Sequence, residues 1–293
     1  MRLDAEFFSR LSRLRLAMGQ RTAMNLTGNR KSTQKGSSME FSDFREYMPG
    51  DDIRRIDWNA YGRLDRLYVK EYMEEKEAVV SILIDTSASM EYGARKKSGL
   101  ACMLAAAFSY MSLGNMDRVL LYDMQKMHLP FAAEGGKRAL PRLADWLERR
   151  RFEGTVDIPK AVGALPAKGS GVTILLSDFL QEGFLEKEPE TLKKLLAFLN
   201  YRKQRVILLH VLAEEELFVE MTGTRNLIDM EDQSTLRLTL DRVSIRNYES
   251  ALQEFLTRMG RECARAGAFY GVCSTGTDIY QLIFQDLRML YDI

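Results

Sequence analysis

The stretch Val79-Val-Ser-Ile-Leu-Ile-Asp-Thr-Ser-Ala-Ser-Met90 decides the fold. Its first six residues are almost all Val, Ile or Leu, which is typical of a strand buried on both faces of a parallel sheet. Three oxygen-bearing side chains, Asp85, Ser87 and Ser89, follow at alternate positions. The pattern of residues 94–113 favours a helix, so the stretch predicts one strand–loop–helix unit.

The loop after this strand predicts a metal site, because ligands of open α/β sheets bind beyond the carboxyl ends of the strands. A second apolar run, Val172-Thr-Ile-Leu-Leu-Ser-Asp178, also ends in an acid. Thr155 lies in a loop that we expect to return to the same edge. Carboxylate and hydroxyl oxygens suit a hard cation. We therefore predict one Mg²⁺ or Mn²⁺ site at Asp85, Ser87, Ser89, Thr155 and Asp178. In the alternative interpretation, the two acids only cap loops and Thr155 only caps a helix.

Composition limits the classes of protein that fit. The chain has 293 residues, 46% of them hydrophobic, and a net charge of +1, which argues against a nucleic-acid partner. Its three cysteines, Cys102, Cys263 and Cys273, form no C-x-x-C pair, so we expect neither a zinc site nor a disulfide framework. Free thiols favour a reducing compartment, so we expect a cytoplasmic protein. The longest apolar stretch, residues 100–113, is too short for a membrane span.

The first 36 residues are basic, with eight Lys or Arg and two acids. Phe7, Leu11, Leu14 and Met18 recur at helical spacing, which predicts a basic amphipathic helix over residues 7–18. Such a helix packs on the body of the protein, or makes a peripheral contact with an anionic membrane or a protein partner. It lacks the interleaved aromatic residues of a nucleic-acid reader.

Residues 1–78 are expected to form a separate N-terminal part, a basic helix with a β-rich extension. Residues 40–47 and part of 59–72 are predicted strands, joined through a Pro49-Gly50 turn. Acidic and basic residues crowd together at 51–57. We interpret them as an ion-pair network that locks the turn, with acid–base chemistry by paired carboxylates as the alternative.

Residues 79–293 alternate between predicted strands and helices. Strands are expected near 118–124, 172–178, 205–212 and 268–273, with helices at 140–147, 191–200 and 246–266 between them. This alternation predicts a doubly wound, mostly parallel α/β sheet with helices on both faces. The alternation of strands and helices stops over residues 213–242, where two short apolar runs predict an inserted hairpin.

The motif Asp85-Thr-Ser-Ala-Ser89, together with Thr155 and Asp178, resembles the metal-ion-dependent adhesion site of von Willebrand factor A-type domains. The resemblance implies that Ser87 and Ser89 bind the ion directly and Thr155 directly or through water. It also implies that the two acids hold ordered waters. One position stays open and takes a carboxylate from a protein partner.

Four upstream segments resemble the bacterial family known as domain of unknown function 58. They are Lys35-Gly-Ser-Ser-Met-Glu-Phe41, Phe44-Arg-Glu-Tyr47, Pro49-Gly-Asp-Asp-Ile-Arg-Arg-Ile-Asp-Trp58 and Lys70-Glu71. Many members carry membrane helices ahead of this region, where the present chain has a short basic helix. The family resemblance implies an adaptor that acts with a MoxR-type AAA+ ATPase in the chaperone-like maturation of other proteins.

We expect the protein not to be an enzyme. The alternative is a Mg²⁺-dependent phosphatase or other hydrolase that uses Asp85. Dehalogenase-type phosphatases need a second Asp two residues after the nucleophile, and this position is Ser87. The sequence has two histidines, no G-x-S-x-G elbow and no Walker-type glycine loop. Any nucleotide-driven work would therefore come from a separate ATPase.

Overall fold

The computed structural model of the chain describes residues 8–9, 11, 15–16, 39–74, 78–128, 130–166, 170–231 and 233–292. The chain divides into two compact units. Unit 1 comprises Met1–Leu26 and Ala78–Ile293, and unit 2 comprises Thr27–Glu77.

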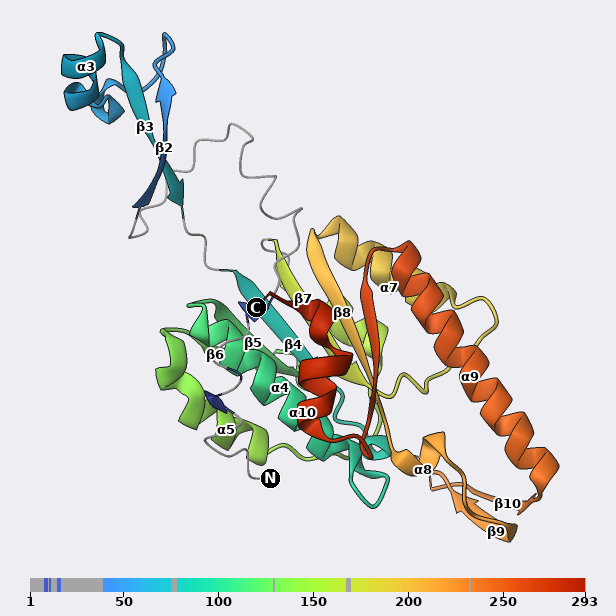
Figure 1. Cartoon of the computed structure of the whole chain (residues 1–293). Coiled ribbons are helices and arrows are strands. Elements are labelled where there is room, and N and C mark those ends of the chain that lie inside the picture. Colours follow the sequence, from blue (N-terminus) through green and yellow to red (C-terminus); the bar gives the residue numbers. More distant parts are fainter. Residues whose placement is uncertain are drawn as a thin grey trace. The chain divides into compact units, whose positions relative to one another are not determined.

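Unit 1 is built around a six-stranded sheet with the strand order β11-β8-β7-β4-β5-β6 (Figure 1). The strands are β4 (Val79–Ile84), β5 (Arg118–Asp123), β6 (Phe131–Ala133), β7 (Gly171–Ser177), β8 (Gln204–Leu212) and β11 (Phe269–Ser274). All neighbours run parallel except β6, which pairs antiparallel with β5 at one edge. Every residue of β7 is buried, as expected for a strand covered on both faces. The predicted mostly parallel α/β fold is confirmed.

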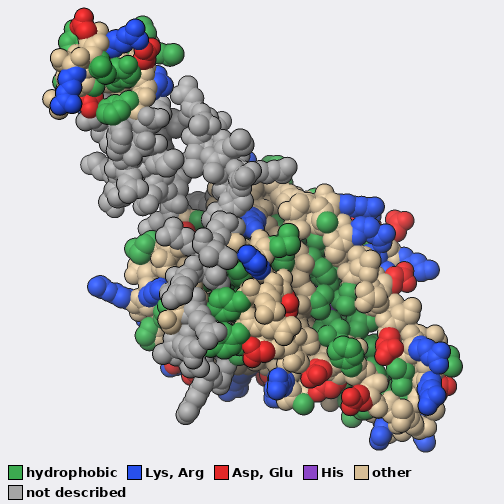
Figure 2. All heavy atoms as spheres, viewed as in Figure 1, with side chains coloured by type: hydrophobic (Ala, Val, Ile, Leu, Met, Phe, Trp, Pro, Cys, Tyr) green, Lys and Arg blue, Asp and Glu red, His purple; other side chains and the backbone are tan. Residues whose placement is uncertain are grey.

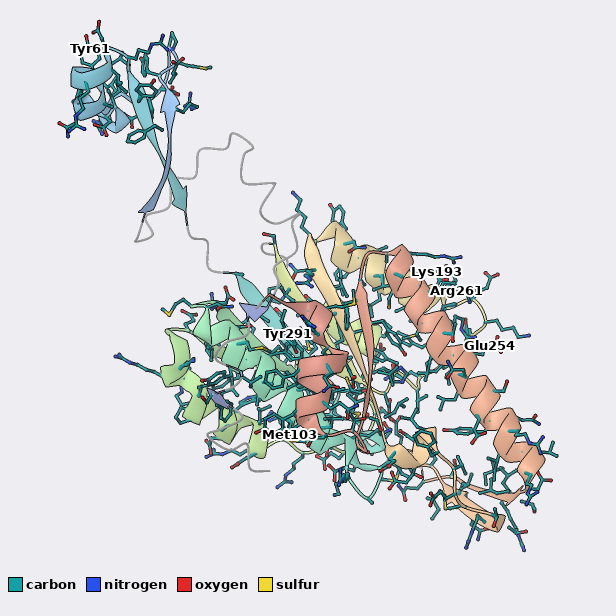
Figure 3. The ribbon with its side chains drawn as sticks, in the orientation of Figure 1. Tyr61, Met103, Lys193, Glu254, Arg261 and Tyr291 are labelled. Carbon is teal, nitrogen blue, oxygen red and sulfur yellow. The ribbon has the colours of Figure 1, made fainter. Side chains whose placement is uncertain are left out.

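Helices cover both faces of this sheet. Their bounds are α4 (Lys97–Gly114), α5 (Leu140–Glu148), α6 (Ile158–Gly163), α7 (Glu190–Tyr201), α9 (Arg242–Arg265) and α10 (Ile279–Gln281). Ile82 belongs to a core with α4, α5 and the C-terminal turns, whereas its neighbour Leu83 belongs to a second core with α6, α7 and α9. In Figure 3, Met103 and Tyr291 lie on the α4 side, and Glu254 and Arg261 lie along α9. This alternation of burial follows from the two-residue period of a strand.

The N-terminal segment is helical at Phe8, Ser9 and Leu11, but the helix predicted over residues 7–18 does not extend to residues 15–16. A short strand, β1 (Arg15–Leu16), pairs antiparallel with β12 (Tyr291–Asp292). Because pairing with the chain end satisfies backbone groups of β1, this tertiary contact overrides the local helical period. Leu11 is fully buried, and the Phe8 ring lies 4.8 Å from that of Tyr110. Phe7, Leu14 and Met18 lie outside the described residues.

Unit 2 contains a β-hairpin and two short helical segments. The elements are β2 (Met39–Glu46), η2 (Ile53–Arg55), α3 (Trp58–Leu64) and β3 (Tyr68–Glu74), and β2 pairs antiparallel with β3. The prediction of a strand within 59–72 is wrong for its first part, which forms α3. The Asp57 carboxylate accepts hydrogen bonds from the Asn59 and Ala60 N–H groups, and this N-cap starts the helix.

The segment 213–242 begins with α8 (Glu214–Leu217) and continues into β9 (Gly223–Ile228) and β10 (Thr235–Leu240). The two strands pair antiparallel and are almost wholly exposed. The sequence analysis grouped residues 1–26 with the extension at 27–78. In the structure, Leu11 and β1 instead contact elements of unit 1.

Candidate metal centre

The candidate site lies where the chain changes direction across the sheet. From β4 the chain crosses to β5 on one side, and it later returns to β7 on the other side of β4. The gap between the carboxyl ends of β4 and β7 is therefore the topological switch point, the usual ligand position in such sheets. Asp85 directly follows β4 and Asp178 directly follows β7. We call Asp85, Ser87, Ser89, Thr155 and Asp178 the strand-end site.

Asp85 is buried, with 1% of its surface exposed, and both carboxylate oxygens have donors. Oδ1 accepts a hydrogen bond from the Ser87 N–H at 2.9 Å, and Oδ2 accepts one from the Ser177 hydroxyl at 2.5 Å. Burial raises the pKa of Asp85, and the charge of Asp178 raises it further. Hydrogen bonds from Ser177 and Ser87 lower this pKa but do not offset the increase. The negative charge at Asp85 therefore lacks full compensation.

The two serines present their hydroxyls side by side. Ser87 Oγ lies 3.0 Å from Ser89 Oγ. Ser87 precedes η3 (Ala88–Glu91), yet its side chain makes no capping hydrogen bond to this turn. The two hydroxyls therefore lie together at the switch point.

Thr155 lies in a loop that adjoins the Asp85–Ser89 loop through the backbone. The Ala88 N–H donates to the Gly154 carbonyl at 2.9 Å, and the Glu153 N–H donates to the Thr86 carbonyl at 3.0 Å. Thr155 itself is exposed. Among the described contacts, none joins its hydroxyl to the other four residues of the strand-end site.

Asp178 is paired with a lysine that sequence reasoning missed. Lys97, at the start of α4, places Nζ 2.7 Å from Asp178 Oδ2 and 2.7 Å from Glu216 Oε1 in α8. Burial alone would raise the pKa of Asp178, but the ion pair with Lys97 keeps it below its usual value. Burial raises the pKa of Glu216 more than Lys97 lowers it. Lys97 therefore offsets the negative charge of Asp178 more fully than it offsets that of Glu216.

The backbone after β7 holds Asp178 in place. Phe179 has a φ of 50°, in the left-handed region that costs a residue with a side chain about 1–3 kcal/mol. Its N–H donates to Ser177 Oγ at 2.9 Å, and the next N–H, of Leu180, donates to Asp178 Oδ1 at 3.2 Å. The Phe179 ring is buried, 5.4 Å from the His210 ring. Tertiary packing thus maintains a backbone turn that orients Asp178.

A third strand, β5, also ends in an acid. Asp123 Oδ1 accepts a hydrogen bond from the Thr86 hydroxyl at 2.7 Å. Its Oδ2 accepts one from Arg150 Nη1 at 3.3 Å, so this carboxylate is paired. The strand-ending position of Asp123 is the same signal that marks Asp85 and Asp178. For Lys97 and Glu216, in contrast, no local sequence signal exists.

The hydroxyl and carboxylate oxygens of the strand-end site are donor types that a divalent cation takes. Among the described residues, no three His, Cys, Asp or Glu side chains form a metal-holding group, so hydroxyls and water would have to contribute. Asp85, Asp178 and Glu216 carry three carboxylates against the one ammonium of Lys97, an imbalance that a dication would offset. Figure 2 shows acidic side chains along the lower edge of unit 1. Hydroxyl and carboxylate oxygens are the donors that Mg²⁺ prefers.

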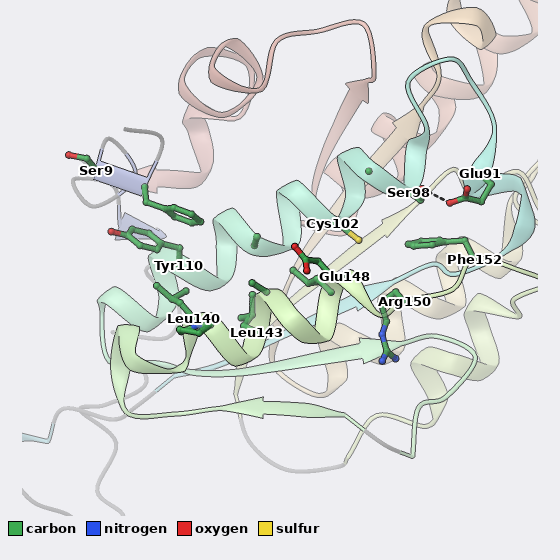
Figure 4. A pocket seen from close by; sticks show the side chains of 16 residues that line it. Ser9, Glu91, Ser98, Cys102, Tyr110, Leu140, Leu143, Glu148, Arg150 and Phe152 are labelled. Carbon is green, nitrogen blue, oxygen red and sulfur yellow. Dashed lines mark hydrogen bonds between the residues drawn. The ribbon is translucent and has the colours of Figure 1, made fainter. Parts of the chain in front are cut away.

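A hollow lies away from the strand-end site, between α4 and α5 (Figure 4). Its volume is about 1160 Å³, and side chains such as Cys102, Leu143 and Leu147 give it mainly apolar walls. Two of its polar side chains have partners, since the Ser98 hydroxyl donates to Glu91 and Arg150 contacts Asp123. We therefore assign the candidate ion site to the strand ends and not to this groove.

The fold and the site define an α/β protein with a cluster of oxygen side chains at the switch point of a mostly parallel sheet. The family model described as "Protein of unknown function DUF58" matches residues 43–255. Because this match covers well over half of the chain, the protein belongs to the DUF58 family.

Relatives occur in mycobacteria. The chain is 28% identical over 185 residues to an uncharacterized protein of Mycobacterium bovis and, equally, to one of Mycobacterium tuberculosis. These matches cover 60% of this chain and 58% of each relative's length.

Two solved structures show limited similarity. One is an aerotolerance-related membrane protein of Bacteroides fragilis, with 15% identity, a TM-score of 0.38, and coverage of 72% of this chain and 99% of that chain. The other is a conserved hypothetical protein, BatB, of Bacteroides thetaiotaomicron, with 13% identity, a TM-score of 0.39, and coverage of 73% and 98%. In the part of the present chain that the structure describes, no helix combines the length and apolarity needed to cross a membrane.

Proposed function

We propose that unit 1 is a von Willebrand factor A-type domain that binds a protein partner through a Mg²⁺ or Mn²⁺ ion at the strand-end site. The observation that carries this proposal is the pair of serine hydroxyls, 3.0 Å apart, at the switch point of the sheet. The buried carboxylates of Asp85 and Asp178 support it, because they follow the two strands that flank this point.

Each residue has a distinct role in this proposal. Ser87 and Ser89 bind the ion directly, as the resemblance implies, and the Ser87 side chain makes no capping hydrogen bond to η3. Asp85 and Asp178 act through ordered water, because both oxygens of each carboxylate already accept hydrogen bonds from protein groups. Thr155 contributes from the adjoining loop, directly or through water. An ion with few charged ligands attracts a further carboxylate, which the partner supplies.

We propose a binding role and not catalysis. The Asp85 carboxylate is almost completely buried, and its two oxygens are held by Ser87 and Ser177. A nucleophile for phosphoryl transfer has to reach the phosphorus atom with a free oxygen. Phosphatase activity that is lost in Asp85→Asn would overturn this part of the proposal.

The proposed partner is a MoxR-type AAA+ ATPase, with this chain as its adaptor. The proposal draws on the family resemblance and on the absence of a nucleotide-binding loop in the sequence. One metal contact is too small for a stable complex, which usually buries about 1,200–2,000 Å². Exposed apolar side chains on unit 2, such as Trp58 and Leu64, and on the β9–β10 hairpin offer additional contact surface.

The metal site is tested by calorimetric titration of the purified chain with Mg²⁺ and Mn²⁺. We expect saturable binding that is weakened in Ser87→Ala and abolished in the double variant Ser87→Ala/Ser89→Ala. Ser98→Ala serves as a control, because its hydroxyl is bonded to Glu91. Equal heats of binding for wild type and the double variant would contradict ion binding by Ser87 and Ser89.

The partner is tested by mixing the chain with a purified MoxR-type AAA+ ATPase and measuring association by sedimentation. We expect association in Mg²⁺, and weaker association in chelator or with Ser87→Ala. Equal association in Mg²⁺, in chelator and with Ser87→Ala would support an adaptor role that does not depend on the metal. No association under any condition would contradict the adaptor role.

A further inference from the structure

The buried ammonium of Lys97 is shared between two carboxylates from different parts of unit 1. Its Nζ lies 2.7 Å from Asp178 Oδ2 and 2.7 Å from Glu216 Oε1, and only 1% of the Lys97 side chain is exposed. Asp178 belongs to the strand-end site, whereas Glu216 belongs to α8. One positive charge therefore connects the proposed ion site to this short helix.

Two further contacts hold α8 on unit 1. Glu215 Oε1 accepts a hydrogen bond from the Ala94 N–H at 2.8 Å. The Glu214 N–H donates to Thr275 Oγ1 at 3.0 Å. Neither contact involves a residue of the strand-end site, so the pair with Lys97 is the one of the three that reaches this site.

The charges around Lys97 favour a dication more strongly when Glu216 is present. When ionised, Asp85, Asp178 and Glu216 carry three negative charges, and Lys97 carries one positive charge. A cation at the strand-end site attracts Glu216 and repels Lys97. Such interactions are screened less among buried groups than in water. Ion binding and the attachment of Glu216 therefore favour each other.

We propose that Lys97 and Glu216 couple ion binding at the strand-end site to the attachment of α8. This inference rests on the proposed metal site and adds a regulation of that site. Because a coupling free energy is reciprocal, the bound ion stabilises the attached α8, and an attached α8 raises the affinity for the ion. Lys97 acts as a positioning residue, since it keeps the Glu216 carboxylate beside Asp178 without binding the ion itself.

The coupling extends to the β9–β10 hairpin, because the chain passes from α8 into this hairpin (Figure 1). The hairpin carries exposed apolar side chains, among them Ile228 and Leu236 with 59% and 62% of their surfaces exposed. Exposed apolar groups that lie together are typical of a protein contact surface. The ion thereby stabilises the base of the surface that the partner contacts, in addition to taking the partner's carboxylate.

The test uses Mn²⁺ as the probe, in the full chain, with three proteins: wild type, Glu216→Gln and Glu214→Gln. Glu214 is the matched control, because it is an exposed acid of the same helix and its N–H keeps the bond to Thr275 in the variant. Calorimetry gives the Mn²⁺ affinity. Amide hydrogen exchange at residues 216–218, whose N–H groups bond within the α8 turn, reports the attachment of this helix. Circular dichroism checks that both variants are folded.

In wild type, Mn²⁺ should slow amide exchange at residues 216–218 about tenfold. In Glu216→Gln, exchange at these amides should be faster and should not respond to Mn²⁺. The Mn²⁺ affinity of this variant should fall by a similar factor, because the coupling is reciprocal. Glu214→Gln should match wild type in both measurements, and exchange in α7 should be the same with and without Mn²⁺ in all three proteins.

Three results would overturn the inference. If Glu216→Gln matches wild type in Mn²⁺ affinity and in the slowing of exchange, the pair with Lys97 is purely structural and the metal site stands. If Glu214→Gln loses as much affinity as Glu216→Gln, the charge of the helix explains the effect and the bond to Lys97 does not. If none of the three proteins binds Mn²⁺, the metal site itself is contradicted, and the coupling with it.

Discussion

Lys97 Nζ lies 2.7 Å from Asp178 Oδ2, and both side chains are buried, with 1% and 4% of their surfaces exposed. The two residues are 81 positions apart in the sequence. The pair places a fixed positive charge beside a proposed metal site. Glu216 shares the same ammonium, so Lys97 joins the end of β7 to the segment that carries the β9–β10 hairpin.

Replacing Lys97 with Met should destabilise unit 1 by about 3–5 kcal/mol, because it leaves a buried carboxylate without its partner. Urea denaturation, followed by circular dichroism, measures the change in the free energy of unfolding. Lys96→Met is the control, since Lys96 pairs with Glu91 at an exposed site where such pairs contribute about 0–1 kcal/mol. The double variant Lys97→Met/Asp178→Asn should regain part of the loss. Equal stability of Lys96→Met and Lys97→Met would contradict this account.

Mg²⁺ should raise the thermal stability of wild type but not that of Asp85→Asn. A ligand that binds only the folded state at a concentration of 100 times its dissociation constant adds about 2.7 kcal/mol. An Asn fits the site of Asp85, because its amide oxygen accepts from the Ser87 N–H and its amide nitrogen donates to Ser177 Oγ. The melting temperature with and without Mg²⁺ is the measurement. Asp145→Asn, at an exposed position of α5, should keep the full Mg²⁺ response.

His210 should make the folded state less stable in acid. It lies buried in β8, and its Nδ1 is 2.7 Å from the Tyr270 hydroxyl. Burial lowers the pKa of His210 from 6.5 to about 4; the charge of Asp178 opposes this shift and that of Lys97 adds to it. Between these two pKa values the unfolded chain binds a proton that the folded chain does not. Stability therefore falls as the pH drops through this window, by about 3 kcal/mol in total.

The measurement for His210 is the free energy of unfolding in urea at several pH values between 4 and 7. In His210→Gln, the free energy of unfolding should change less with pH across this range than in wild type, even if the variant is less stable overall. His128→Gln should keep the wild-type slope, because His128 is exposed. A slope that persists in His210→Gln would assign the acid sensitivity to the carboxylates instead.

Asp57→Ala should loosen α3 in unit 2. The Asp57 carboxylate accepts from the Asn59 N–H at 2.9 Å and the Ala60 N–H at 3.2 Å, and loss of such an N-cap costs about 1 kcal/mol. Amide hydrogen exchange of residues 58–64 should become about fivefold faster. Asp65→Asn, at the other end of the helix, should not accelerate exchange, because an acid there opposes the helix dipole. Unchanged exchange combined with lost partner binding would mark this stretch as an interface.

Local sequence predicted those features that depend on short stretches of chain. Val79–Ile84 is apolar enough to be recognised as a buried strand, and Asp85 and Asp178 are marked by their position after such strands. The same reasoning failed at α3, where the apolar pattern of residues 59–72 suggested a strand. There the cap supplied by Asp57 determined the structure. It also failed at β1, which is a strand because it pairs with Tyr291–Asp292.

The sequence by itself determined the parallel strands and the acids at their ends, because a buried strand must be apolar along its whole length and a polar loop must follow it. Only the tertiary structure decided which charges meet at those ends. Lys97 reaches Asp178 across 81 residues and Glu216 across 119 residues. Electrostatic energy depends on distances of a few ångströms in space, and the path of the folded chain sets those distances.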